Sequence, residues 1–412
     1  MGKDQKLLWA TITKWLALVK CLTLAKWLAF IKWLTLNQKT TLALKTFVTP
    51  SLSGLVWLTK IRALSRLAVS LTLVALFFGC ESAEPKKEAA VDSAAKAALA
   101  TKSSEKGLIR NAEGLVVLRA SISPDPTTPV TFLIGDDLGF FQKRGLKLDI
   151  VGNIPVTQLV AAIMSGQLDV SHGAHINRTI AGISAGAKIL AVVGNTETTP
   201  IYPHMVGVVR KDSPIRQAAD IIGQKIGLSN PGGCHEYTPY AWLEKHGIKD
   251  PKNKIQTVII ARSLLEQALR QGDIDMAMLH KTPAEIANNG EFDVIYSDYD
   301  VWEGDGGATP NYFGTQFIKD HPDVVRNFVA AVAETLNWMN ENLDGARAIT
   351  AKRTNQDISK ITSNYYTPDG LMKPVTAELW IELLTRFGEI KPGITVPQVF
   401  TNEFNPYYTG QF

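Results

Sequence analysis

The chain has 412 residues, enough for two or three domains, and its 45% hydrophobic content suits a globular protein with an apolar segment attached. Its formal net charge of +4 is unevenly spread: residues 1–80 carry 11 of the 43 Lys and Arg but one acid, Asp4. The rest of the chain, with 32 basic and 38 acidic residues, is mildly acidic. This balance argues against nucleic acid as a partner.

Residues 1–59 form a leader extension that contains a six-residue repeat, KWLALV, KCLTLA, KWLAFI and KWLTLN, over Lys14–Asn37. A six-residue step turns a helix by about 240°, so the repeated lysines scatter over three faces and make no amphipathic stripe. A membrane-surface segment is one interpretation. We favour a tandem DNA repeat upstream of the true translation start, and expect residues 1–59 to be absent from the mature protein.

Residues 60–80 have the order of a secretory signal peptide. Lys60, Arg62 and Arg66 precede an apolar run that ends at Gly79, directly before Cys80. The run is short for a membrane-spanning helix. Phe77 to Cys80 resembles a bacterial lipobox, although Phe stands where Leu and a small residue are usual, so an uncleaved signal anchor is the alternative. We expect Cys80 to be lipidated and to anchor the protein to a membrane.

Residues 81–113 are rich in Ala, Ser, Glu and Lys and contain no aromatic residue, which predicts a flexible linker. The chain has three cysteines, Cys21, Cys80 and Cys234. Once the leader is removed and Cys80 is acylated, Cys234 has no partner, which excludes a disulfide scaffold. Export to the periplasm or the cell surface fits both features.

From residue 114 onwards, short β-branched runs alternate with helical patterns, which predicts an α/β fold with mostly parallel sheets. Pauses at Thr196–Pro203 and Ala308–Gly314 suggest two crossings between lobes. We therefore assign residues 114–202 and 310–412 to lobe 1 and residues 203–309 to lobe 2. The predicted strands are 115–122, 146–151, 168–170, 189–193, 205–209, 225–228, 255–260, 274–279 and 292–296. The predicted helices are 156–165, 179–185, 240–245, 264–271, 324–340, 345–352 and 377–387.

Five segments of the body carry a family resemblance. They are Leu138–Leu146, Ala162–Val170, Val208–Ile215, Ala219–Gly227 and Leu269–Asp275. Their order and spacing are similar to the nitrate/sulfonate/taurine and pyrimidine-precursor (NMT1-like) class of periplasmic substrate-binding proteins of ABC importers. The resemblance implies a two-lobed periplasmic-binding-protein fold of type II, with two crossing strands and C-terminal helices packed on lobe 1. It also implies a ligand cleft between the lobes and partnership with an ABC permease and ATPase.

Such a cleft collects loops from strand ends and helix N-termini, where unpaired backbone N–H groups face a ligand. Here those loops are 124–129, 171–175, 194–196, 229–237 and 280–282. The predicted ligand-binding residues are Thr127, Thr128, His172, His175, Asn195, Ser229, Gly233, Cys234, His235, Glu236, Tyr237, His280 and Lys281.

Four of the seven histidines fall in these loops, beside Cys234 and Glu236, which favours contact with a ligand over ordinary packing. His, Cys and Glu can also bind a soft metal. Because no zinc-type spacing is present, we assign neither a metal nor a cofactor. Met276 and Met278 alternate on a predicted strand and are expected to be core residues.

Glu236 bears on the charge of the ligand. A carboxylate in a first helical turn would repel an anion, so a cleft-facing Glu236 favours an aminopyrimidine-like ligand over a sulfonate. The alternative is that Glu236 caps its own helix and faces solvent.

We therefore expect a monomeric, lipid-anchored solute-binding protein and not an enzyme. Two alternatives stay open: an enzyme that resembles pyrimidine-precursor synthases in fold, and a sensing module for a membrane receptor. The Cys-rich motif of those synthases is absent from this sequence, which also contains no phosphate loop or catalytic triad motif.

Overall fold

The computed structural model describes residues 107–122, 126–229 and 231–411. The predicted leader, the signal peptide with Cys80 and most of the predicted linker lie outside these ranges. At the linker's described end, Arg110 forms an antiparallel bridge with Val116, so residues 107–113 belong to the folded body. None of the described helices has the length and hydropathy needed to cross a membrane.

Lobe 1 is built on one twisted set of strands. β1 pairs with β2 in parallel and β3 pairs with β9 in antiparallel orientation. Val170 links the two pairs, because it bridges Ala120 on one side and Phe313 on the other. The strands of lobe 1 are β1 (Val116–Ile122), β2 (Leu146–Asn153), β3 (Ile189–Val193) and β9 (Asn311–Gly314).

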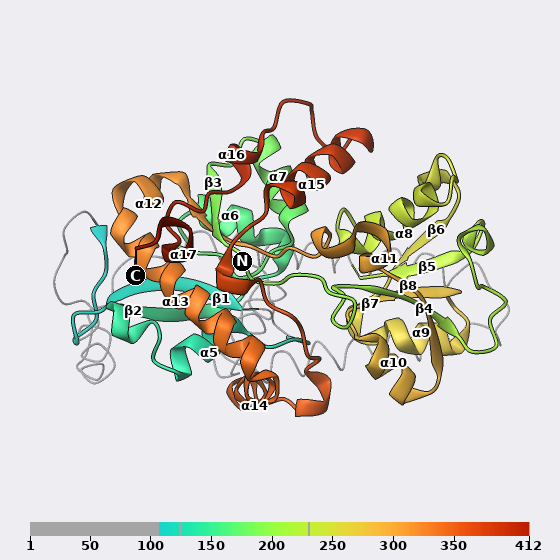
Figure 1. Ribbon diagram of the computed structural model, residues 1–412, viewed down its shortest axis with the longest axis horizontal. Helices are drawn as coiled ribbons and strands as arrows, with labels where there is room; N and C mark the ends of the chain where they lie inside the picture. Colours follow the sequence, from blue (N-terminus) through green and yellow to red (C-terminus); the bar gives the residue numbers. More distant parts are fainter. Residues whose placement is uncertain (1–106, 123–125, 230, 412) are drawn as a thin grey trace, which may run out of the picture. The chain divides into compact units, whose positions relative to one another are not determined.

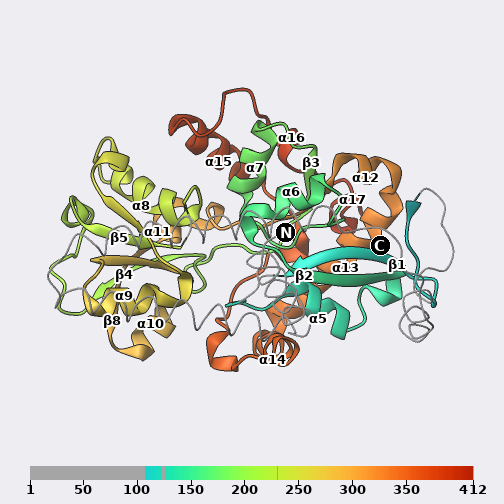
Figure 2. The same cartoon turned by 180° about the vertical axis from the view of Figure 1, so that it is seen from behind.

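Lobe 2 contains a five-stranded sheet in the order β6-β5-β7-β4-β8. Its strands are β4 (Val206–Arg210), β5 (Lys225–Leu228), β6 (Gln256–Ile259), β7 (Met276–Leu279) and β8 (Phe292–Ser297). Side chains alternate between the two faces. Met276 and Met278 are fully buried in the same core as helix α8 (Cys234–Lys245), as expected. Ala277 and Leu279 face the core of α9 (Leu265–Gln271) and α10 (Pro283–Asn289). Both views show α8 on one side of the sheet and α9 and α10 on the other (Figure 1, Figure 2).

Two segments, 194–205 and 298–310, connect the strands of lobe 1 to those of lobe 2. Thr196 Oγ1 donates a hydrogen bond to the carbonyl of Gly307 at 2.9 Å, and Asp298 Oδ1 accepts one from Met205 N at 3.0 Å. The second segment begins with the short helix α11 (Asp298–Trp302). These bonds tie one crossing to the other. The two-lobed α/β fold expected from the resemblance is therefore present.

The prediction of mostly parallel sheets was wrong. Three strand pairs are parallel, and three, β3 with β9, β4 with β7 and β4 with β8, are antiparallel. The antiparallel pairs all involve β4 or β9, the first strand after each crossing. Each of these strands enters its lobe from a crossing and not from a βαβ unit of the same sheet, and each runs against the strands it pairs with.

The remaining helices cover lobe 1. They are α5 (Thr131–Asp137), α6 (Leu159–Met164), α7 (Ile176–Ser184), α12 (Thr315–Asp320), α13 (Pro322–Glu341), α14 (Leu343–Thr354), α15 (Pro374–Arg386), α16 (Val396–Val399) and α17 (Pro406–Thr409). Short 3-10 turns are η3 (Gln142–Arg144), η4 (Val156–Gln158), η5 (Ala218–Ile221), η6 (Pro251–Asn253), η7 (Arg262–Leu264), η8 (Glu303–Asp305), η9 (Ile358–Lys360) and η10 (Pro368–Gly370). Helix α13 packs its apolar stripe, including Phe328 and Leu336, into the core of lobe 1.

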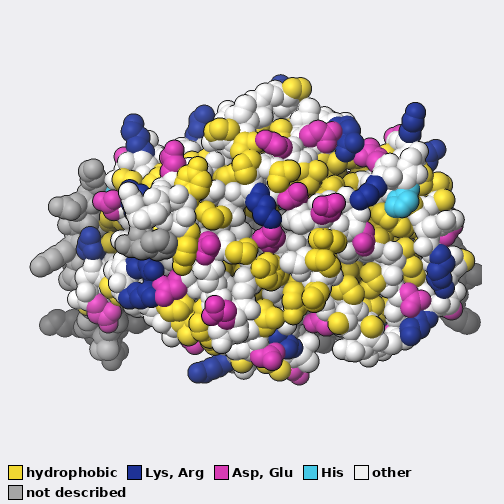
Figure 3. Space-filling view, viewed as in Figure 1, with side chains coloured by type: hydrophobic (Ala, Val, Ile, Leu, Met, Phe, Trp, Pro, Cys, Tyr) yellow, Lys and Arg dark blue, Asp and Glu magenta, His cyan; other side chains and the backbone are white. Residues whose placement is uncertain are grey.

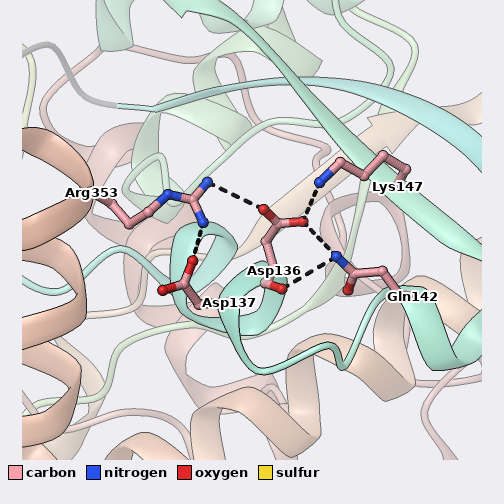
Figure 4. Close-up of polar contacts among 5 residues, drawn as sticks. All are labelled: Asp136, Asp137, Gln142, Lys147 and Arg353. Carbon is pink, nitrogen blue, oxygen red and sulfur yellow. Dashed lines mark hydrogen bonds and ion pairs between the residues drawn. The ribbon is translucent and has the colours of Figure 1, made fainter.

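A polar network fastens α14 to lobe 1 (Figure 4). Asp136, at the end of α5, accepts hydrogen bonds from Lys147 Nζ at 2.7 Å and from Gln142 Nε2 at 2.9 Å. Arg353 of α14 bonds to Asp136 at 3.2 Å and also to Asp137. The network thereby joins a helix, a strand and the C-terminal segment. Helix α15 differs from α14, because it also touches lobe 2: Trp380 lies edge-on to Tyr237 of α8.

On the face shown in Figure 3, positive and negative side chains are interspersed over the surface. No continuous basic patch is visible on this face.

Candidate functional site

A cavity of about 380 Å³ lies between the lobes, a size suited to a small molecule. Lobe 1 contributes Thr127, Thr128, His172, His175, Arg178 and Asn195, and the C-terminal part of the chain contributes Thr362, Ser363 and Asn364. Lobe 2 contributes Gly233, Cys234, His235, Arg262, His280 and Lys281, and the crossings contribute Thr196, Pro203, His204 and Thr309. The lining is therefore shared by both lobes and the hinge.

Several of these residues follow a strand or the bridging residue Val170. His172 and His175 follow Val170, Asn195 follows β3, and His280 follows β7. A loop at a strand end is held by a packed strand. Its side chains are therefore positioned firmly at the edge of the sheet, where a ligand can reach them. At the other wall, Gly233 is the N-cap of α8, and Cys234 and His235 form its first turn.

Five of the seven histidines line the cavity, and four of them, with Cys234, make a connected cluster. His235 Nε2 lies 2.8 Å from His280 Nε2, and Cys234 Sγ lies 3.4 Å from His204 Nε2. The ring of His204 is edge-on to that of His280, with 4.6 Å between centroids, and tilted against that of His175 at 5.2 Å.

Backbone carbonyls fix two of these rings. His280 Nδ1 lies 2.7 Å from the carbonyl oxygen of His204, and His175 Nε2 lies 3.1 Å from that of Gly306. A carbonyl can only accept, so each of these nitrogens carries the hydrogen. The other nitrogen of each ring then has a lone pair: Nε2 of His280 faces His235, and Nδ1 of His175 accepts a hydrogen bond from Asn177 N at 3.4 Å.

Burial keeps the cluster neutral. It lowers the pKa of His172 and of His175 to about 4, and, with nearby positive charge, it lowers the pKa of His204, His235 and His280 well below 6.5. Burial also raises the pKa of the Cys234 thiol to about 12. At neutral pH the cavity therefore offers uncharged imidazoles and a thiol.

The charged side chains that line the cavity within the described residues are all cationic: Arg178, Arg262 and Lys281. Lys281 is paired with Glu266 at 2.6 Å, but no carboxylate belongs to the described lining. The electrostatic field of the cavity is therefore positive, and it favours a ligand that carries negative charge.

Polar contacts join the lobes at the cavity. From α7, Asn177 Nδ2 donates to the carbonyl of Gly232 at 2.8 Å and Arg178 Nη2 to that of Pro231 at 3.4 Å. Arg262 Nη1 donates to Thr127 Oγ1 at 3.3 Å. The lobes are thus in contact around the cavity.

Of the thirteen predicted ligand-binding residues, ten line the cavity and Ser229, Glu236 and Tyr237 do not. Ser229 Oγ instead lies 3.2 Å from His235 Nε2, behind the lining. Tyr237 is 1% exposed and packs in an aromatic core with Trp380 and Phe387.

Glu236 turns away from the cavity. Its carboxylate accepts hydrogen bonds from Gly232 N at 2.6 Å and from the Tyr240 hydroxyl at 3.1 Å. A first-turn carboxylate is drawn to the free N–H groups at its own helix end. The interpretation of Glu236 as a cleft-facing acceptor is therefore wrong, and the alternative of a local cap describes its contacts.

Sequence reasoning missed His204, Arg178 and Arg262. His204 directly follows the predicted crossing, so a hinge position could have suggested it. Arg178 is on the first turn of α7, a helix that begins three residues earlier than predicted. Arg262 lies just past β6, at a strand end like the other loops, and could have been found by that rule.

Residues 127–346 match the family described as NMT1/THI5 like. The chain belongs to this family. No curated protein sequence is significantly similar to it. The fold is similar to that of the periplasmic aliphatic sulphonate binding protein SsuA from Escherichia coli, with 17% identity and a TM-score of 0.56 over 68% of this chain and 91% of the other.

Two further solved structures illustrate the range of functions on this family's fold. The periplasmic nitrate-binding protein NrtA from Synechocystis PCC 6803 is 12% identical, with a TM-score of 0.57 over 70% of this chain and 87% of the other. The desulfurization enzyme DSZB is 16% identical, with a TM-score of 0.51 over 72% of this chain and 99% of the other. At these identities the likeness establishes the fold alone.

Proposed function

We propose that this protein is the solute-binding lipoprotein of an ABC importer, which captures a small ligand between its lobes and delivers it to a membrane permease. The observation that carries the proposal is the cavity shared by both lobes and the hinge. Closure of two lobes around a ligand buries it from both sides, and the closed form is a state that a transporter can recognise. Family membership and the binding proteins among the similar structures support the same role.

The ligand that this cavity favours carries an anionic group. Arg178 and Arg262 line the cavity, whereas the carboxylate of Glu236, on which the preference for an aminopyrimidine depended, is bonded to Gly232 and Tyr240. A guanidinium pairs with planar anions through two parallel hydrogen bonds. A sulfonate, carboxylate or related anion is therefore the class of ligand that we propose.

Binding without chemistry fits the state of the most nucleophilic group in the cavity. The thiolate is the reactive form of cysteine, and burial raises the pKa of Cys234 to about 12. The thiol is therefore protonated and inert at neutral pH, so we propose a binding protein rather than an enzyme of the DSZB kind.

The proposal includes export, a lipid anchor on Cys80 and a monomeric state. It rests here on the sequence, in which a basic segment, an apolar run and a cysteine precede a polar tether. The location that follows is the periplasm or the cell surface.

Native mass spectrometry of untagged protein, purified without refolding, tests the function directly, because a closed cavity retains its ligand. Calorimetry with taurine, nitrate and an aminopyrimidine then compares the ligand classes on wild type, Arg262→Gln and, as a matched control, Arg326→Gln, an exposed arginine of α13. We expect an anion to bind and to lose about 1.5–3 kcal/mol of affinity in Arg262→Gln only.

Small-angle scattering with and without the ligand found in this way checks the closure. Lobes that close should make the particle more compact at saturation. A purified protein with no retained ligand, no response to any of the three probes and no compaction would contradict the solute-binding role.

A further inference from the structure

The cluster of histidines around Cys234 has no part in the capture of an anion as described above. A neutral imidazole binds an anion well only when it donates a hydrogen bond to it. The N–H groups of His280 and His175 already donate to backbone carbonyls. What the cluster does offer is several lone pairs and a sulfur within a few ångströms.

We propose that the cleft coordinates a late transition-metal ion through Cys234, His235 and His280, with an anionic co-ligand at the remaining coordination position. The inference rests on the proposed function and names the cargo of that same cavity: a metal ion that is captured together with an anionic ligand.

The three candidate ligand atoms lie close together. The sulfur of Cys234 and one ring nitrogen each of His235 and His280 lie within 4.8 Å of one another, and all three residues line the cavity. Tetrahedral zinc at Zn–N distances of about 2.0–2.1 Å holds two nitrogens roughly 3.3 Å apart. The Nε2 atoms of His235 and His280 are 2.8 Å apart, so a small widening admits the ion between them.

The ring of His280 is already held by a hydrogen bond to the backbone. A metal-binding histidine commonly donates its other N–H to a carbonyl or carboxylate, which fixes the ring and the tautomer. His280 Nδ1 makes such a bond to the carbonyl of His204 at 2.7 Å, and its Nε2 lone pair points at His235. The geometry of a ligand is therefore already built.

Without an ion, the cluster leaves a buried ring nitrogen of His235 without a hydrogen-bond partner among the described residues. Because His280 Nε2 has no hydrogen, the His235 ring must carry its own on Nε2, which leaves the buried Nδ1 of His235 without a partner among the described residues. Coordination moves that hydrogen to Nδ1 and converts both Nε2 lone pairs into metal bonds. The thiol of Cys234 loses its proton to solvent as the metal–sulfur bond forms.

The donor set selects the ion. Imidazole and thiolate ligands suit zinc, cobalt, nickel and copper, whereas magnesium and calcium require oxygen ligands. No carboxylate is in the described part of the lining.

Charge then requires the co-ligand. One thiolate neutralises only half of a divalent ion, and Arg178 and Arg262 add positive charge around it. Three protein ligands leave one tetrahedral position open toward the cavity. An anion at that position can bond to the metal and the guanidinium groups together.

The test uses untagged, chelator-treated protein and Co²⁺ as a spectroscopic substitute for Zn²⁺, under anaerobic conditions. We expect one ion per chain, a thiolate-to-cobalt charge-transfer band, displacement by Zn²⁺, and tighter binding when an anion such as taurine or a carboxylate is present. Cys234→Ser should abolish the band, and His280→Gln should weaken zinc binding by more than about a hundredfold, beyond the effect of losing an outer-sphere partner. His321→Gln, directly after α12 and outside the described cavity lining, is the matched control.

Circular dichroism checks that each variant is folded. If Cys234→Ser does not fold, the zinc affinity of His280→Gln tests the proposal instead. Binding without the charge-transfer band, or binding that both variants retain, overturns the proposal. If the protein retains an anionic ligand through Arg262 but binds no cobalt or zinc, the metal site fails and the solute-binding role survives. If the metal binds as expected and no compaction or retained ligand is found, the site stands and the importer role fails.

Discussion

Acidification is expected to destabilise the metal-free protein, because the cavity buries histidines that the unfolded chain exposes. An exposed histidine has a pKa of about 6.5, whereas the pKa of His172 and of His175 is about 4 in the folded protein. Between these values the unfolded chain binds more protons, so the free energy of unfolding rises with pH and falls as the pH drops.

The magnitude follows from the difference between a pKa of about 4, to which burial lowers His172 and His175, and the ordinary value of 6.5. Each group contributes about 1.4 kcal/mol per pH unit between roughly pH 6.5 and pH 4, so His175 alone accounts for at most about 3.4 kcal/mol. His204, His235 and His280 act in the same direction. For comparison, domains of this kind are stable by about 5–15 kcal/mol.

Asp298 opposes this effect. Burial raises its pKa to about 7, far above the usual 3.8, so the folded state holds a proton that the unfolded state loses. Its contribution is complete below pH 4 and is lost as the pH rises to 7, with a slope equal and opposite to that of one histidine. His172 and His175 together still leave a net loss of about 1.4 kcal/mol per pH unit on acidification.

Urea-induced unfolding, followed by tryptophan fluorescence from pH 7.5 to pH 5 with a chelator present, measures the slope. His172→Leu places an apolar side chain against Phe132 and should reduce the slope of the unfolding free energy against pH by about 1.4 kcal/mol per pH unit. Asp298→Asn should increase that slope. A free energy of unfolding that stays flat or rises from pH 6.5 to pH 5 would refute the reasoning.

Three further predictions concern single residues. Glu236→Gln should leave ligand affinity unchanged and cost about 1 kcal/mol of stability, since it weakens the bond to Gly232; a large loss of affinity in calorimetry would return Glu236 to the cleft. Gly307→Ala would bring a Cβ within 2.1 Å of Thr198 Oγ1 and 2.6 Å of His204 Cβ, so we expect a loss of about 1–3 kcal/mol, with an unchanged melting temperature as the opposing result. Cys80→Ser should yield an unacylated, uncleaved or released protein; mature wild-type protein that retains residues 1–79 would contradict the lipid anchor.

Strand positions in the body were predictable because alternation and β-branched runs report burial directly. Eight of the nine predicted strands correspond to β1–β8, and the ninth, Leu168–Val170, is reduced to the single bridging residue Val170. The strand β9 was missed because its four residues, Asn311–Gly314, fall in a segment that was taken for the crossing alone. Its place depends on pairing with β3, a contact that local sequence does not encode.

Helix starts were less predictable. The sequence predicted a helix over residues 240–245, whereas α8 begins at Cys234 and contains Pro239 in its interior. The true start at Cys234 places Cys234 at the cavity wall and Glu236 in the first turn, where the sequence already suggested it. The direction of Glu236 depends instead on its bonds to Gly232 N and to the Tyr240 hydroxyl, which its place in the first turn does not decide by itself.

The loops of the cavity were predictable from a general rule on strand ends, but the direction of each side chain was not. His204 joins the cluster because Gly307 lets the two crossings approach, and that approach also depends on the bond between Thr198 and the buried Asp298. Contacts between segments a hundred residues apart decide such orientations. Residue type at a strand end therefore predicts a cleft, while the chemistry within it requires the packed structure.

The contacts between the lobes differ in kind, and this difference bears on how the cavity opens. At the cavity, the lobes are joined by polar bonds such as Asn177 to Gly232 and Arg262 to Thr127, which water can replace at little net cost. Behind His175, which lines the cavity, Trp380 packs edge-on at 4.7 Å, donates to the carbonyl of Gly306 and contacts Tyr237 of lobe 2. Separating these buried rings would expose a large apolar area. Opening should therefore break the polar bonds first and rotate the lobes about the aromatic contacts and the two crossings, so that ligand enters on the side of Thr127 and Arg262.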